Sequence, residues 1–114
     1  MPTLRILTNV QVPADARASL LATASRALAE LLGKPESYVM VMLEEGRDLY
    51  FAGSAAPAAY LEVKSLGLPE SRTPDYSHAL CDLVGQLIGV PADRTYIEFA
   101  TPPRHMFGWN NGTF

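Results

Sequence analysis

Cysteine is almost absent from this chain of 114 residues, in which Cys81 stands alone. A single cysteine excludes an intrachain disulfide and the paired-cysteine motifs that bind zinc or exchange thiols. Cys81 lies in an amphipathic segment, so a buried packing role is expected for it. The two histidines are isolated in the sequence; we interpret His78 as a helix-surface residue and His105 as a loop or pocket-rim residue. The sequence therefore predicts neither a metal site nor a cofactor.

An excess of positive charge and a long apolar run are also missing. Nine Lys and Arg residues stand against twelve Asp and Glu, a net charge of −3 that argues against nucleic-acid or anionic-membrane partners. No apolar run approaches a membrane span, and the first residues lack the basic-then-apolar order of a signal peptide. With 48% apolar and 18% charged residues, the composition is typical of one globular domain. We expect a cytoplasmic protein, or one exported by an unconventional route.

Two segments have the apolar spacing of amphipathic helices. Apolar residues recur at steps of three and four over 20–32 and again over 80–88. Gly33 and Gly89 fall where a left-handed residue ends a helix. The expected start signals are prolines in the first turn and a threonine N-cap, namely Pro13, Pro74 and Thr73.

The segments around these two helices also repeat. The stretch LRILTN, residues 4–9, aligns with LEVKSL, residues 61–66, and LLGKPESYVMVML aligns with LIGVPADRTYIEF. Each half therefore predicts a strand, a helix and a strand, with a crossover long enough to join parallel strands. We expect one domain over 1–114, made of pseudo-repeats at about 2–56 and 57–114.

Two helices can cover only one face of such a sheet. Residues 39–43 are apolar on both sides of the pleat, so a bare apolar face is expected, and with it a symmetric oligomer whose sheets face inward. Residues 48–53 could form one more short strand. The tail over 102–114 carries three aromatic residues, which predicts pairing with or packing on another chain.

Short motifs lie along the whole chain at near-constant spacing. They are Met1-Pro2, Thr8-Asn9, Gly33 to Tyr38, Gly53-Ser54, Ser65 to Gly67, Leu80-Cys81, Asp93 to Ile97 and the ending GWNNGTF. Together they resemble the macrophage migration inhibitory factor family of the tautomerase superfamily. The resemblance implies an α+β two-layer fold with a four-stranded mixed sheet and two helices on one face, assembled as a homotrimer around a central channel.

Pro2 follows Met1 directly, and its residue type alone leaves two explanations open. Proline is tolerated at the first residue of a strand, or the chain needs a free prolyl nitrogen. The resemblance favours the second, with Pro2 as the catalytic base once Met1 is removed. Burial and a nearby cation would lower the pKa of such an amine from about 8, which suits proton transfer next to a carbonyl near neutral pH.

Lys34 and Leu66 are the polar contacts that the resemblance implies. Lys34 follows the first helix, where a cation also suits the helix's negative end; in the family the matching lysine binds the substrate carboxylate. Leu66 stands where the family has an isoleucine whose backbone amide contacts the substrate.

Aromatic residues are expected to form the walls of the pocket. In the family the residues matching Tyr96 and Trp109 come from the neighbouring subunit, with the residue matching Phe114 close by. Core or interface packing is the alternative for each of them. Tyr38 is expected at the rim.

Three features depart from the family pattern. Glu98 stands where the vertebrate proteins have an asparagine near the substrate's ring hydroxyl, and Phe107 replaces a small aliphatic residue at the pocket edge. Both changes bear on substrate choice and rate. The family's Cys-x-x-Cys segment is PAAYL here, residues 57–61, so thiol-disulfide activity is not expected.

The leading hypothesis is a cofactor-free keto–enol tautomerase of phenylpyruvate type, acting on a small aromatic α-keto acid. The alternative is a cytokine-like trimer that binds a receptor protein, with weak or vestigial tautomerase activity. A third option follows the superfamily's dehalogenases and hydratases, which use extra arginines near the pocket; the candidates are Arg5, Arg94 and Arg104.

Overall fold

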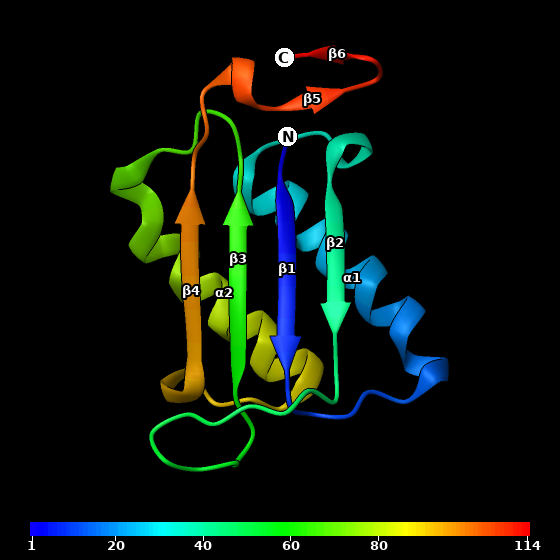
Figure 1. Ribbon diagram of the computed structural model, residues 1–114, viewed down its shortest axis with the longest axis vertical. Helices are drawn as coiled ribbons and strands as arrows, with labels where there is room; N and C mark the ends of the chain where they lie inside the picture. Colours follow the sequence, from blue (N-terminus) through cyan, green and yellow to red (C-terminus); the bar gives the residue numbers. More distant parts are fainter.

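The computed structural model describes residues 1–114, and its main sheet has four strands crossed by two long helices (Figure 1). In chain order these elements are β1 (Thr3–Thr8), α1 (Ala14–Leu32), β2 (Met40–Glu44), β3 (Ala59–Lys64), α2 (Thr73–Ile88) and β4 (Thr95–Ala100). A short hairpin of β5 (Gly108–Trp109) and β6 (Gly112–Thr113) ends the chain. Single 3₁₀ turns connect the larger elements: η1 (Glu36–Tyr38), η2 (Glu70–Arg72), η3 (Ala92–Arg94) and η4 (Arg104–Met106).

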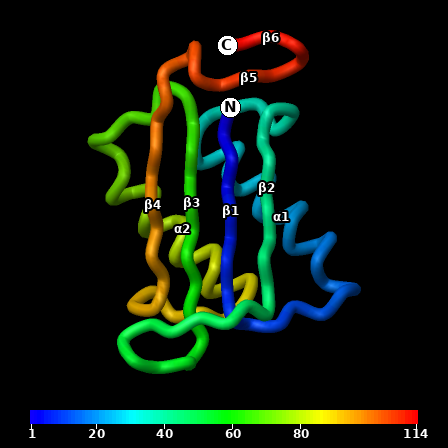
Figure 2. Tube along the Cα trace, viewed as in Figure 1, coloured from blue at the N-terminus to red at the C-terminus, as the bar shows by residue number.

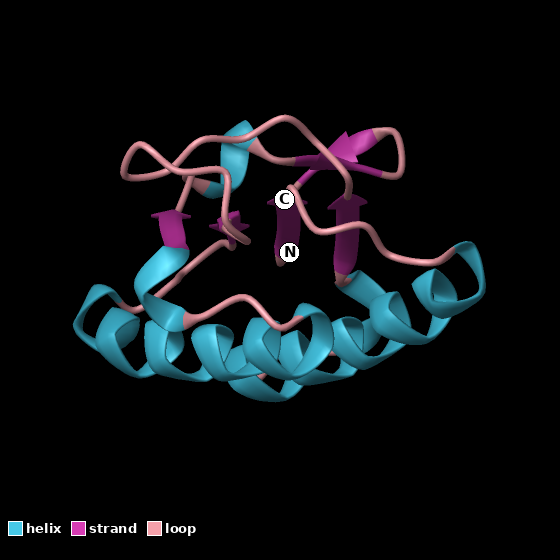
Figure 3. Ribbon diagram, turned by 90° about the horizontal axis from the view of Figure 1, so that it is seen from below, coloured by secondary structure: helices cyan, strands magenta, loops and turns pink.

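The sheet has the order β2-β1-β3-β4. β1 and β2 are parallel, as are β3 and β4, while β1 and β3 are antiparallel at the centre. Each parallel pair is joined through one helix, and both helices lie on the same face (Figure 3). The predicted fold class, a four-stranded mixed sheet with two helices on one face, is confirmed.

The helix ends follow the expected signals more closely than the helix starts. Gly33 and Gly89 adopt φ of 64° and 71°, the left-handed conformation that ends a helix. The prediction for Thr73 is wrong: it is the first residue of α2, and its hydroxyl donates to the Glu70 carbonyl. The turn η2 runs directly into α2, so the helix begins one residue earlier than a Thr73 cap would place it. Pro13 lies just before α1 rather than in its first turn.

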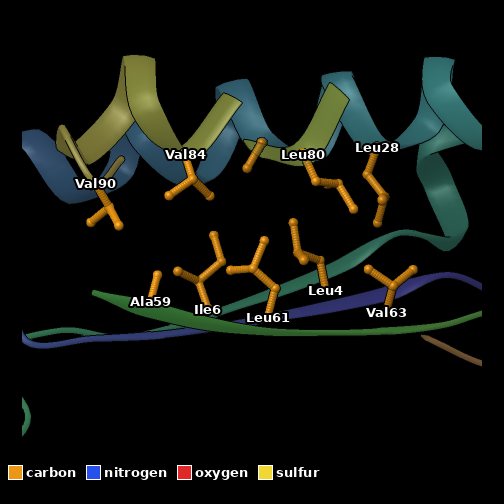
Figure 4. Close-up of a cluster of buried hydrophobic side chains, with 10 residues drawn as sticks. Leu4, Ile6, Leu28, Ala59, Leu61, Val63, Leu80, Val84 and Val90 are labelled. Carbon is orange, nitrogen blue, oxygen red and sulfur yellow. The ribbon is translucent and has the colours of Figure 1, made fainter. Parts of the chain in front are cut away.

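One hydrophobic core fills the space between sheet and helices (Figure 4). Alternate residues of β1 and β3 point toward the helices, as a period of two requires. They meet residues spaced three or four apart on α1 and α2. The buried cluster is Leu4, Ile6, Ala24, Leu28, Ala59, Leu61, Val63, Leu80, Val84 and Val90.

The other sheet face carries both charged and apolar side chains, which corrects the expectation of a bare apolar face. Its exposed apolar and aromatic residues include Met40 and Met42 on β2, at 59% and 39% exposed, and Tyr96 on β4, at 63%. At the centre, Arg5 binds Glu44 at 2.5 Å and Glu62 at 3.1 Å. These charges lie on three adjacent strands, so the sheet register lets them neutralise one another without a second chain.

The Arg5–Glu44 pair predicts a specific acid sensitivity. Arg5 lowers the pKa of Glu44 from its usual value of 4.5, so the pair stabilises the fold fully above that pH and loses its effect as pH falls through the lowered pKa. Glu44→Gln should therefore be less stable than wild type at pH 7, with the difference shrinking on acidification below about 4.5. Urea unfolding at several pH values measures this, and a pH-independent difference would contradict it.

The surroundings of several other residues settle further expectations. Residues 48–53 form no strand; Phe51 and Ser54 make an isolated bridge. Cys81 is half-buried rather than buried, and burial raises the pKa of its thiol. His78 is exposed on α2, as expected. None of the helices combines the length and apolar character needed to cross a membrane.

Candidate functional site

The two ends of the chain meet at one end of the sheet, beyond the start of β1 (Figure 2). Pro2 precedes β1, and its carbonyl accepts a hydrogen bond from the Met40 N–H at the start of β2. Beyond β4, the tail passes over the same end of the sheet through η4 and folds back as the β5–β6 hairpin (Figure 1). Residues that are farthest apart in the sequence therefore become neighbours.

A cavity of about 210 Å³ lies between the first residues and the tail. Three of the predicted pocket residues from the tail, Phe107, Trp109 and Phe114, line it together with Tyr38 from η1. The remaining lining residues were not predicted from the sequence: Met1, Thr3, Ser37, Val39, Met40 and Gly108.

Aromatic contacts shape the cavity wall. The rings of Trp109 and Phe114 stack with centroids 5.7 Å apart, and Tyr38 meets Trp109 edge-on at 5.4 Å. Phe107 contacts Phe114 at 6.1 Å. Such rings present a flat apolar surface that suits another flat ring. In this structure the tail packs on its own chain, whereas the sequence favoured another chain.

The hairpin turn explains how a short tail can hold these rings. Asn110 and Asn111 have φ of 52° and 63°, the left-handed pair that a tight two-residue hairpin turn requires. Asparagine tolerates this conformation better than other non-glycine residues. The Phe114 N–H donates to the Phe107 carbonyl at 3.0 Å, and the Arg104 guanidinium donates to the main-chain oxygen of Phe114 at 3.1 Å. These bonds close the tail into a loop over the N-terminus.

Met1 covers Pro2 in this structure. The Pro2 side chain is fully buried, and its nitrogen is part of the peptide bond with Met1, so it carries no basicity here. The free amine at this position is that of Met1. Burial, then the charges of Lys34 and Arg104, lower the pKa of that amine below its usual 8.0. The surroundings thus favour an uncharged amine at this end of the sheet.

Lys34 and Leu66 lie at the same end of the sheet but outside the cavity wall. Lys34 follows the end of α1, where its backbone N–H donates to the Ala29 carbonyl at 3.0 Å. Its ammonium pairs with no carboxylate of the chain. Leu66 is buried just beyond β3, and its backbone N–H donates to no other backbone group.

Tyr96 and Glu98 are not brought to this cavity. Across the sheet, Thr3 pairs with Lys64 and Lys64 pairs with Ala100. Ala100 is therefore the residue of β4 that lies nearest to the row of Pro2. Tyr96 lies four positions before Ala100, about 13 Å along the strand. It is 63% exposed on the face without helices. Its side chain cannot reach Pro2 of its own chain.

Glu98 has a partner of its own. The Tyr60 hydroxyl donates to its carboxylate at 2.6 Å, and this bond raises the pKa of Tyr60 to about 12. No cation of the chain pairs with Glu98. The Glu98 side chain is therefore held by Tyr60 on the open face of β4.

The three candidate arginines have separate places. Arg5 is engaged by carboxylates on the open sheet face, and Arg94 by the carbonyls of a loop at the far end of the sheet. Only Arg104 lies near the N-terminal amine. No group of three acidic, histidine or cysteine side chains is arranged to hold a metal ion.

Two β-α-β units that place Pro2 beside an aromatic cavity have the architecture of the tautomerase superfamily. The family model described as Macrophage migration inhibitory factor (MIF) matches residues 1–114. The chain belongs to the MIF family.

Curated relatives and solved structures agree with this assignment. The chain is 35% identical over 115 residues to a macrophage migration inhibitory factor homolog from Trichinella spiralis, with both chains fully covered. It superposes on the crystal structure of a MIF homologue from Prochlorococcus marinus with TM-score 0.91, at 47% identity and 98% coverage of each chain. The Trichinella spiralis structure gives TM-score 0.90 at 34% identity, covering 98% of this chain and 99% of the other.

Proposed function

We propose that the protein is a cofactor-free keto–enol tautomerase of phenylpyruvate type, with Pro2 as general base after removal of Met1. The observation that carries the proposal is that Pro2 is buried between Met1 and Thr3, two residues that line the aromatic cavity, and that the surroundings lower the pKa of the Met1 amine. A base that is neutral near pH 7 is what α-proton transfer requires.

The reaction moves one proton and consumes nothing. The Pro2 nitrogen takes a proton from the carbon next to the carbonyl, and the electron pair of the broken C–H bond forms a carbon–carbon double bond. The carbonyl π pair moves to oxygen, and the protonated Pro2 delivers its proton there, which regenerates the base. Keto acid and enol contain the same atoms, so no co-reactant is needed.

The remaining residues bind and orient the substrate. The unpaired Lys34 ammonium holds the carboxylate, and the Leu66 N–H is an available donor for it. Trp109 and Phe114 contact the ring, Tyr38 lies at the rim, and Phe107 narrows the entrance.

We further propose that the working form is a homotrimer. MIF-like structural neighbours suggest the family's oligomeric arrangement. The distance between Tyr96 and Pro2 supports it, because Tyr96 and Glu98 can serve a pocket only in another subunit. There Glu98 would face the distal end of the substrate ring.

The direct test measures proton movement in a chain of known N-terminus. Intact mass establishes that Met1 is gone, and enol absorbance then follows phenylpyruvate and 4-hydroxyphenylpyruvate. A chain without Met1 that accelerates neither interconversion would refute the proposal.

Lys34→Gln should raise KM for phenylpyruvate by about 10- to 100-fold, because one charge-assisted hydrogen bond to the carboxylate is lost. Most of the effect should be in KM, since the carboxylate does not react. Arg26→Gln, on the exposed surface of α1, removes the same charge away from the cavity and is the control. If both variants have the same KM, Lys34 does not bind the carboxylate, and its charge instead stabilises the C-terminal end of α1.

A further inference from the structure

Three of the sequence motifs are not used by the proposed chemistry, and they meet at one loop. The motifs are Thr8-Asn9, Gly53-Ser54 and the start of Asp93 to Ile97. The loop, residues 51–58, lies at the end of the sheet opposite Pro2, between β2 and β3 (Figure 2).

Asn9 anchors one side of the 51–58 loop. Its side-chain amide donates to the Ala55 and Ala56 carbonyls at 3.1 and 3.0 Å and accepts from the Ala58 N–H at 2.9 Å. The Thr8 hydroxyl donates to the Ala58 carbonyl at 2.7 Å. The loop is thus fastened to the end of β1.

Arg94 holds the other side with more contacts. Its guanidinium donates to the carbonyls of Phe51 at 3.0 Å, Ser54 at 3.1 Å, Ala56 at 3.1 Å and Pro57 at 2.9 Å. Arginine has five donors spread over a rigid plane and can reach four separate carbonyls, whereas lysine has three donors on a single nitrogen. No carboxylate competes for this cation.

The turn that Arg94 holds is strained. Phe51 and Ser54 exchange two backbone hydrogen bonds, and the residues between them, Ala52 and Gly53, have φ of 53° and 70°. A left-handed alanine is unfavourable and persists only where its surroundings fix it. Arg94 bonds the carbonyls at both ends of this turn.

The fixed turn presents one aromatic ring. The Phe51 ring lies between the Arg94 guanidinium, 5.1 Å from its centroid, and Tyr96, whose ring meets it edge-on at 4.8 Å and 82°. Tyr96 is otherwise 63% exposed. Phe51 is therefore the aromatic neighbour that supports the Tyr96 ring on this open face.

We propose that Arg94 is a positioning residue, which fixes Phe51 so that Tyr96 is held ready as an aromatic wall for the substrate of a second copy of this chain. The inference rests on the proposed function, in which Tyr96 serves a neighbouring pocket. It extends that function by making ring recognition depend on a loop far from the subunit's own Pro2.

The test compares two 2-oxo acids of equal charge, phenylpyruvate and the aliphatic 4-methyl-2-oxopentanoate, by exchange of the C3 protons with deuterium. Arg94→Lys keeps the charge but loses the guanidinium that donates hydrogen bonds to four carbonyls. It should raise KM for phenylpyruvate about three- to tenfold, the size of one lost aromatic contact, and leave kcat and the aliphatic KM unchanged. Phe51→Leu should do the same, and Phe51→Tyr, which keeps a ring, should not. Arg26→Gln is the charge and folding control.

A double-mutant cycle distinguishes an effect of Arg94 on the Tyr96 ring from a general loss of structural order. In a Tyr96→Leu background, Arg94→Lys should have no further effect on the phenylpyruvate KM, because the wall it positions is gone. Equal losses on both substrates, or a full effect without Tyr96, would overturn the proposal.

The NMR resonances of the Tyr96 ring can be measured whether or not the protein has enzymatic activity. Arg94→Lys and Phe51→Leu should shift them, while Arg26→Gln should not; unchanged resonances in both would overturn the positioning role. If wild-type protein lacking Met1 exchanges no protons, the proposed function fails, and the resonances still decide whether Arg94 positions Tyr96.

Discussion

Pro2→Gly is expected to lower kcat/KM for phenylpyruvate by about 10²- to 10⁴-fold, the range that a positioned general base contributes. Glycine still permits removal of Met1, but it leaves a primary amine on a residue without the ring that Pro2 buries. The base is then free to move and is more fully solvated. Enol absorbance measures the loss, and Pro13→Gly, the same change just before α1, is the matched control.

The pH profile gives the same prediction a second test. An amine acts as a base only when uncharged, so kcat/KM should rise with pH through the amine pKa and then level off. In this structure burial, Lys34 and Arg104 lower the pKa of the Met1 amine below its usual 8.0. We expect the same surroundings to act on a Pro2 amine exposed by removal of Met1, which would place the rise below pH 8. Equal rates for wild type and Pro2→Gly would exclude Pro2 as the base, whereas a rise at or above pH 8 would show that the surroundings do not lower the pKa of the Pro2 amine.

Leu61→Ala is expected to lower the free energy of unfolding by about 2–5 kcal/mol. Leu61 is fully buried at the centre of β3, where it pairs with Ile6 on one side and Ile97 on the other. Neighbours on two strands and the helices above leave little room for the structure to relax into the cavity. Urea unfolding at one fixed protein concentration measures the change, because any assembly would make the midpoint concentration-dependent.

Gln86→Ala is the control for this core substitution. Gln86 is exposed on α2, and alanine is a good helix former, so its effect should stay within about 0.5 kcal/mol. A Leu61→Ala loss of similar size would mean that the core closes around the missing side chain.

The sequence predicted those parts of the fold that depend on local signals. Helix ends at Gly33 and Gly89 could be predicted because left-handed glycines mark them. The start of α2 could not, because Thr73 looks like an N-cap unless the preceding turn η2 is known. The ion pairs on the open sheet face were missed for a different reason: Arg5, Glu44 and Glu62 come together only once three strands are set in register.

Some features of the candidate site could likewise be predicted from the sequence, and others depend on the folded arrangement. The cavity of Tyr38, Phe107, Trp109 and Phe114 was expected from motifs, but the geometry that closes it depends on the left-handed Asn110 and Asn111. The separation of Tyr96 from Pro2 follows from strand register, which no local pattern contains. The contacts of Arg94 were missed because its partners are backbone carbonyls, which every sequence has.

The position of Met1 has a consequence for the timing of protein synthesis. Once folded, the chain holds Met1 half-buried in the cavity, with the tail hairpin closed beside it. The proposed function requires removal of Met1, and a peptidase reaches this residue most easily before the tail packs against it. We therefore expect Met1 to be removed while the nascent chain is still emerging and the last residues, which complete the cavity, have not yet been translated.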